Sequence, residues 1–339
     1  MRTEFLGLLA ASAILAGVAF AQTTSKNWTP PKTSWGDPDL EGTWTSDDQY
    51  GVPLERPAKF GTRKTLTEQE LAERVKEDEL LQTSIEAGER PNAGYWKSQK
   101  GVDAAAVPAN WLEFARRASR QTSLVVDPPD GRIPLTETGK ALAAAAAARR
   151  GQRPGSWLDL TMYDRCITRG VAGSILPVVY GNGTQFIQTP GLVALRYEMI
   201  HETRIVPTDG RQHSPASLRS YMGDPIGHWE GNTLVVETTN FIGGHVGVGL
   251  NGNGPPYSDE LKLVERFTRT SDKTIQYEVT ITDPVTYTAP WTVAFPITKE
   301  PGYQIFEYAC HEGNYAMHNR LSAARAEERK AAAQTAEDK

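Results

Sequence analysis

Thr274-Ile275-Gln276-Tyr277-Glu278-Val279-Thr280-Ile281 is the stretch of sequence that decides the fold. Its apolar residues occupy every second position, and successive side chains of a β-strand point to opposite faces of a sheet. The stretch therefore predicts a strand with one buried and one solvated face. Such strands are typical of antiparallel sheets.

Further segments rich in β-branched and aromatic residues lie before and after this strand. They are 122–126, 232–239, 261–269 and 291–297. A hairpin is also expected, because Pro190-Gly191 suits a type II turn between two apolar segments. Closely spaced strands without long helices between them predict a mainly β fold, an antiparallel meander that closes into a lipocalin-like barrel. Closure is favoured because it removes exposed sheet edges.

The segments that flank the strands are expected to form peripheral helices and tails. Thr67 and Glu70 form a capping box at the start of a polar helix, and an alanine-rich helix is expected from Thr136. The interpretation treats residues 22–315 as one globular domain, because no Gly/Ser/Pro-rich linker separates two cores. The expected parts are an N-terminal extension with the polar helix at 22–120, a barrel-like core at 121–315 and a polar C-terminal tail at 316–339.

The first 21 residues have the features of an export signal. Arg2 supplies a positive start, an apolar run covers residues 6–20, and Ala19-Phe20-Ala21 has the small-x-small pattern of a cleavage site. The run is shorter than a typical membrane span, and no other stretch is longer, so no membrane span is expected after cleavage. An uncleaved N-terminal anchor is the alternative. The expected location is the periplasm or the extracellular medium.

The net charge of the chain narrows the class of partner that it is expected to bind. The chain of 339 residues has 36 Lys and Arg against 41 Asp and Glu, and its formal net charge is -5. No overall positive field is therefore available to hold nucleic acid. A small-molecule substrate is the expected partner, and the oligomeric state is left open.

The two cysteines, Cys166 and Cys310, are expected to form a disulfide. An even count of cysteines in an exported chain favours a bond that closes a long loop. A reactive or metal-binding thiolate within Cys310-His311-Glu312 is the alternative. Neither cysteine has the paired C-x-x-C spacing of a zinc or redox site.

All six histidines lie between residues 201 and 318. Histidine titrates near neutral pH and suits proton transfer when a carboxylate holds one tautomer. Neighbours on a strand point to opposite faces, so the useful pairs are expected across strands. At least one histidine–carboxylate pair is predicted to face a common cavity. The candidate catalytic residues are His201, Glu202, His228, Glu230, His311 and Glu312.

A metal site is an alternative use of these residues, with His213 and Asp209 as additional ligands. The sequence contains none of the usual zinc-site spacings, such as H-E-x-x-H. It also lacks a G-x-S-x-G nucleophile elbow and the Gly-Lys-Ser/Thr ending of a phosphate loop. The interpretation therefore assigns neither a metal nor a cofactor.

Aromatic residues are concentrated in and beside the predicted strands. A barrel mouth lined by such residues favours a flat or partly apolar ligand. The glycine-rich loop 243–254 is predicted to be a mobile lid that carries His245, with an ordinary connection as the alternative. The candidate substrate-binding residues are Tyr197, Trp229, His245, Tyr308 and Tyr315.

Two resemblances to known families add to this interpretation. The chain contains Asp164-Arg-Cys-Ile167, Glu198-Met-Ile-His-Glu202, Met222-Gly-Asp224 and Phe306-Glu-Tyr-Ala-Cys-His-Glu-Gly-Asn-Tyr315. With these segments it resembles a family of exported bacterial proteins known mainly as uncharacterised sequences. The resemblance implies that function uses 198–202, 222–230 and 307–315. Separately, Gly42-Thr43-Trp44 resembles the entry strand of lipocalin-like barrels, where a tryptophan closes one end; a surface tryptophan beside a turn glycine is the alternative.

Two functions fit these features. The first is an exported enzyme that uses cofactor-independent histidine/carboxylate acid–base chemistry, of the lyase, isomerase or hydrolase type, on a small, partly aromatic compound in the barrel pocket. The second is a non-catalytic binding or carrier protein for such a compound. A carrier pocket is mostly apolar, whereas an enzyme needs several titratable groups that converge on one cavity. The His, Glu, Asp and Asn content of the segments above favours the enzyme.

Overall fold

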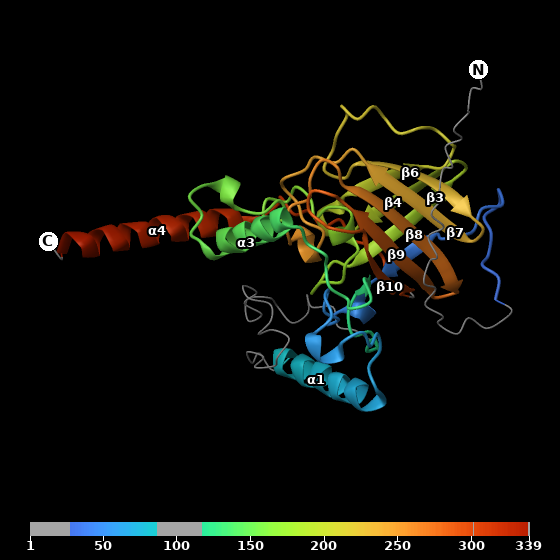
Figure 1. Cartoon of the computed structure of the whole chain (residues 1–339), viewed down its shortest axis with the longest axis horizontal. Helices are drawn as coiled ribbons and strands as arrows, with labels where there is room; N and C mark the ends of the chain where they lie inside the picture. The colour runs from blue at the N-terminus through green and yellow to red at the C-terminus, as the bar shows by residue number, and fades with distance from the viewer. Residues whose placement is uncertain (1–27, 87–116, 301, 338–339) are drawn as a thin grey trace, which may run out of the picture.

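The computed structural model describes residues 28–86, 117–300 and 302–337. The expected export signal at 1–21 lies outside these residues. In the described part of the chain, ten antiparallel strands form one sheet that curls into a nearly closed barrel (Figure 1). The strands are β1 (Gly42–Thr45), β2 (Val125–Asp127), β3 (Gly183–Thr189), β4 (Leu192–Tyr197), β5 (Thr203–Pro207), β6 (Asp224–Glu230), β7 (Thr233–Thr239), β8 (Lys262–Ser271), β9 (Thr274–Thr282) and β10 (Trp291–Lys299).

The strand order is β5-β4-β3-β1-β10-β9-β8-β7-β6, and β2 also pairs with β10. The alternation predicted for residues 274–281 is confirmed in β9, where Ile275, Tyr277, Val279 and Ile281 are fully buried. The hairpin around Pro190-Gly191 joins β3 to β4 as predicted. β1 pairs with both β3 and β10, so the barrel begins within the segment 22–120 and not at residue 121.

The seam of the barrel lies between β5 and β6. No ladder of hydrogen bonds joins these two strands among the described residues, although they lie next to each other. Gly227 of β6 allows this close approach, because a Cβ atom at that position would stand 2.8 Å from Cγ1 of Val206 on β5. The sequence did not predict β5 or β6, which form the two edges of the sheet.

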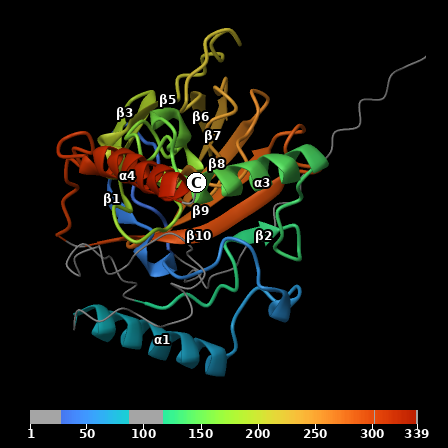
Figure 2. The same ribbon diagram turned by 90° about the vertical axis from the view of Figure 1, so that its left-hand side faces the viewer.

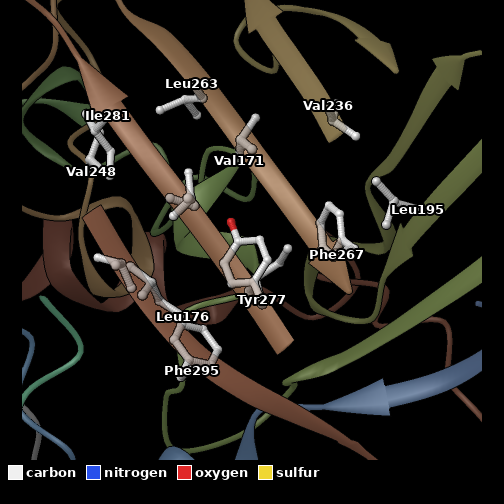
Figure 3. Packing of buried hydrophobic residues seen from close by; sticks show 14 of the residues in the cluster. Val171, Leu176, Leu195, Val236, Val248, Leu263, Phe267, Tyr277, Ile281 and Phe295 are labelled. Carbon is white, nitrogen blue, oxygen red and sulfur yellow. The ribbon is translucent and has the colours of Figure 1, made fainter. Parts of the chain in front are cut away.

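The interior of the barrel is filled by side chains. The rings of Phe267 and Phe295 flank that of Tyr277, with centroid separations of 5.0 and 5.3 Å, and all three residues are fully buried (Figure 3). Val171 and Val248, from two loops, pack into the same cluster. The expected ligand pocket inside the barrel is therefore a wrong prediction, because aromatic rings and loop residues occupy that space.

Trp44 of β1 is also buried inside the fold. Its Nε1 donates to the carbonyl of Leu40 at 2.9 Å, and the guanidinium of Arg269 stands 5.5 Å from the ring centroid. Arg269 in turn donates to the carbonyl of Asp39 at 2.7 Å. Trp44 is therefore a core residue of the barrel, and the surface alternative is wrong.

One ion pair lies within this core. Arg204 of β5 and Glu265 of β8 are 1% and 0% exposed, and Nη2 of the arginine lies 2.6 Å from Oε2 of the glutamate. Arg204 also donates to the hydroxyls of Tyr197 at 2.9 Å and Thr238 at 3.0 Å. The hydroxyl of Tyr277 donates to Glu265 at 3.1 Å. Side chains of five strands therefore meet in one buried hydrogen-bonded network.

The helices are α1 (Glu68–Glu86), α3 (Glu137–Gly151) and α4 (Tyr315–Glu337). They lie outside the barrel as predicted, with α1 on one side and α3 and α4 on another (Figure 2). The capping box of Thr67 and Glu70 forms, and the Thr136 hydroxyl caps α3. In the described part of the chain, no helix has the length and apolar composition needed to cross a membrane.

The buried network predicts a non-additive effect on stability. Arg204→Met should lower the free energy of unfolding by about 3–5 kcal/mol, because it leaves the Glu265 charge buried without its partner. The double variant Arg204→Met/Glu265→Leu should recover most of this loss. The measurement is urea denaturation, with Arg211→Met, at an exposed ion pair, as the control that leaves the midpoint unchanged. Equal stability of Arg204→Met and the wild type would contradict the analysis.

Candidate functional site

A disulfide joins Cys166 to Cys310, as predicted; the sulfur atoms are 2.02 Å apart. It links the segment 302–314, which follows β10, to the loop that precedes β3. Asn314 strengthens the connection, because its Nδ2 donates to the carbonyl of Asp164 at 3.2 Å. The bond therefore holds a segment without helix or strand structure against the loops at one end of the barrel.

A cleft of about 1010 Å³ lies between these two joined segments, and we call it the aromatic cleft. The rings of Tyr180 and Tyr308 stack across it, with centroids 6.4 Å apart and an interplanar angle of 23°. Burial raises the pKa of Tyr308 to about 12. Phe306 and Tyr315 are 66% and 72% exposed. The aromatic residues that line the cleft are Tyr163, Tyr180, Tyr303, Phe306, Tyr308 and Tyr315.

Carboxylates stand among these rings. Glu198, Glu307 and Glu312 line the aromatic cleft together with Asp164, whose charge is offset by Arg320 at 2.8 Å. No described basic side chain forms an ion pair with Glu307 or Glu312. The guanidinium of Arg169 is buried 5.8 Å from the ring centroid of Tyr163. Among the described residues, the lining of the cleft contains four carboxylates and no Lys or Arg, so the lining is negative when the carboxylates are ionised.

Glu198 follows β4 and lies at the floor of the cleft. The hydroxyl of Tyr303 donates a short hydrogen bond to its Oε2. Burial raises the pKa of this carboxyl, and the hydrogen bond from Tyr303 only partly opposes the effect. A carboxyl with a raised pKa therefore faces the aromatic cleft.

The turn after Glu198 is strained. Ile200 and His201 have φ values of 64° and 47°, in the left-handed region that non-glycine residues rarely adopt. Each such residue costs about 1–3 kcal/mol and persists only where surrounding contacts hold it. The turn places Glu198 in the lining of the aromatic cleft and Glu202 outside that lining. The Thr168 hydroxyl donates a hydrogen bond to Oε2 of Glu202 at 2.8 Å.

Burial also shifts the pKa of Glu202. Loss of hydration raises the pKa of its carboxyl to about 7, and the hydrogen bond from Thr168 and the charge of Arg204 oppose the effect. Two carboxyls with raised pKa values thus flank one strained turn. Sites with perturbed pKa values and strained backbone are frequently functional.

The structure does not bring the predicted histidines together. His201 is exposed, and its Nδ1 lies 2.9 Å from the carbonyl oxygen of Tyr308. His228 and Glu230 do form a pair at 3.1 Å, but both are exposed and Glu230 is also bound by Arg266. His311 is exposed as well. The expected common cavity for these side chains is therefore a wrong prediction, because they project to solvent from separate elements.

The histidine with the most carboxylate contacts is His213, which the catalytic set did not include. Its Nδ1 lies 3.0 Å from Asp224, and its Nε2 lies 3.5 Å from Glu237. The backbone nitrogen of Ser214 also donates to Asp224 at 2.8 Å. These contacts fasten the loop between β5 and β6 to β6 and β7, so they serve to hold the loop.

The predicted substrate-binding residues divide into three groups. Tyr308 and Tyr315 line the aromatic cleft, as does Glu312 from the catalytic set. Tyr197 is fully buried in the barrel network, and Trp229 packs against the core, so neither reaches this cleft. His245 is exposed and lies outside it, with its ring 6.0 Å from that of Tyr221.

The glycine-rich loop is packed and not an open lid. Val246 and Val248 are buried, and Gly247 donates to the carbonyl of Gly252 at 2.8 Å. A Cβ at Gly173 would stand 2.6 Å from the backbone nitrogen of Gly252. The glycines therefore allow two backbones to approach closely, and the mobility of the loop stays a prediction.

Sequence reasoning missed Tyr163, Glu198, Tyr303 and Phe306 as members of one site. The available signal was the disulfide, since Cys166 brings Tyr163 and Cys310 brings Tyr308 to the same place. Tyr303 and Glu198 could not be paired in this way. Their contact depends on the path of the chain after β10.

The disulfide predicts where the chain opens on reduction. Cys166→Ser/Cys310→Ser should increase amide hydrogen exchange in 303–314 while β7, β8 and β9 keep their protection, because the bond anchors only that segment. Reduced wild-type protein is the matched control and should behave alike. Two free thiols in the denatured, unreduced protein, or unchanged exchange in the variant, would contradict the assignment.

The raised pKa of Glu202 predicts a pH-dependent stability. The folded carboxyl keeps its proton up to about pH 7, whereas the unfolded one loses it near its usual value of 4.5, so stability should fall as the pH rises through this interval. Glu202→Gln should remove this loss, and we expect it to gain about 3 kcal/mol relative to the wild type between about pH 4 and about pH 8. Denaturation at both pH values tests this, with exposed Glu260→Gln as control. A difference independent of pH would contradict it.

Neither a cluster of metal ligands nor a similar protein identifies what this cleft binds. Within residues 28–86, 117–300 and 302–337, no three His, Cys, Asp or Glu side chains gather in a way that could hold a metal ion. Comparison with protein-family models, curated proteins and solved structures finds no match to this chain.

Proposed function

We propose that the protein binds a small organic cation with an aromatic or apolar part in the aromatic cleft. The observation that carries this proposal is the combination of six aromatic rings with Glu198, Glu307 and Glu312 around one opening. Ring faces and carboxylates both attract a cation. The exposure of Phe306 and Tyr315 supports the proposal, because apolar rings at the edge of a cleft are typical of a binding surface.

Acid–base catalysis is the second candidate, and Glu198 takes the role that the sequence suggested for histidine. Its raised pKa and its hydrogen bond from Tyr303 are features of a general acid or base. Lyase, isomerase or hydrolase chemistry without a cofactor would then act on the bound compound. The carboxyl would take a proton from the ligand or give one to it.

We also propose that the chain acts in the periplasm or is secreted. Disulfides persist in oxidising compartments, so the Cys166–Cys310 bond is compatible with export. The predicted signal at 1–21 supports the same location.

Three probes that share one ring test the ligand class. Benzylamine, benzyl alcohol and benzoate differ mainly in charge, and calorimetric titration should give the tightest binding for the protonated amine. Glu307→Gln/Glu312→Gln and Tyr180→Ala should each weaken benzylamine binding by about tenfold, because cation–π and charge contacts contribute about 1–2 kcal/mol. Glu260→Gln is the exposed control. Tighter binding of benzoate, or no binding of any probe, would refute the cation proposal.

Measurements of turnover in the wild type and in one variant distinguish a carrier from an enzyme. If the wild type converts a bound amine, Glu198→Gln should lower turnover by ~10²-fold or more, while the dissociation constant rises no more than in Glu307→Gln/Glu312→Gln. Full turnover in this variant would exclude Glu198 as the acid or base. Binding without turnover in the wild type would leave the carrier function.

A further inference from the structure

A second cleft, of about 90 Å³, lies between the C-terminal end of α3, the segment 158–168 and the glycine-rich loop, and we call it the basic cleft. It shares Tyr163 with the aromatic cleft but has the opposite charge. Its polar lining includes Arg149, Arg150, Arg165, His245, Asn251 and Asp159.

The positive charge of this cleft is not neutralised. Among the described residues, no carboxylate forms an ion pair with Arg149, Arg150 or Arg165, whereas nearby Arg153 pairs with Glu327 at 2.8 Å. The one acidic side chain in the lining, Asp159, accepts a hydrogen bond from the backbone nitrogen of Ser156 at 2.9 Å. The lining of this small cleft therefore contains three arginines and one carboxylate.

Arg165 is held in place by contacts that leave its charge available. Its guanidinium carbon lies 4.5 Å from the ring centroid of Trp157, and its Nη1 lies 3.6 Å from Sδ of Met162. An arginine stacked on a ring loses less side-chain freedom when it binds an anion. Asn251 adds a polar group, because its Oδ1 is buried and has no hydrogen-bond partner in the described structure.

We propose that the basic cleft binds an oxyanion, either free phosphate or the carboxylate of a small molecule. The guanidinium fork matches both groups in geometry and charge. The volume is below the roughly 150 Å³ of a cavity that holds benzene, so it suits a small anion and not a large aromatic ligand. A hydroxyl of a protonated oxyanion could donate to Asn251. This site is separate from the aromatic cleft, and its failure would leave the function proposed above untouched.

The test uses inorganic phosphate and acetate as probes on the full chain at low salt. Calorimetry should detect saturable binding of at least one probe, and Arg165→Gln and Arg149→Gln/Arg150→Gln should each weaken it by about tenfold or more. Arg153→Gln, at the paired arginine outside the lining, is the matched control and should bind as the wild type does.

Trp157 supplies a second readout. Binding at Arg165 should change tryptophan fluorescence in the wild type, and Trp157→Phe should remove this change while the heat of binding persists. Phosphate binding alone identifies a phosphate site, and acetate binding alone identifies a carboxylate site. No saturation by either probe up to about 10 mM, or equal affinity in the arginine variants and the wild type, would overturn the proposal.

Discussion

The buried pair of Arg204 and Glu265 is the interaction that joins side chains of five strands of the barrel. Removing two such charges from water costs several kcal/mol each, and only good geometry with further hydrogen bonds offsets that cost. Those hydrogen bonds come from Tyr197, Thr238 and Tyr277, on three other strands. The network is complete only when β4, β5, β7, β8 and β9 stand in their native register. The charges therefore couple the register of the strands to the closure of the barrel.

Because the barrel is filled, the clefts lie at its periphery. Aromatic rings and loop residues occupy the interior, so the chain builds its clefts from connections and from the segment after β10. That segment has no ladder or helix to hold it before α4 begins. The Cys166–Cys310 bond and the contact between Tyr303 and Glu198 take over this role.

The two clefts share the segment that carries Tyr163 but differ in electrostatic character. One side of this segment faces stacked tyrosines and glutamates, and the other faces arginines. The two sides of this segment therefore present opposite charges. The strained turn at Ile200 and His201 belongs to the acidic side, where it separates the environments of Glu198 and Glu202.

The sequence by itself determined the features that arise from local rules. Alternation predicted β9, Pro190-Gly191 predicted a hairpin, and Thr67 and Thr136 predicted helix starts, because each effect acts within a few residues. An even cysteine count predicted the disulfide, since only one pairing is possible. These features were sufficient for the barrel class and for part of the aromatic cleft, at Tyr308 and Tyr315.

Only the tertiary structure decided the buried ion pair, the filled interior and the members of both clefts. Arg204 and Glu265 are 61 residues apart, and Tyr303 and Glu198 are 105 apart, so no local pattern links them. Strands β5 and β6 were missed because they are the edge strands, and their partners and the seam between them are set by closure. Histidines grouped in sequence were scattered in space because each lies on a different connection or face. Which residues lie close together in a barrel depends on the register and shear of its strands, and local composition does not encode either of them.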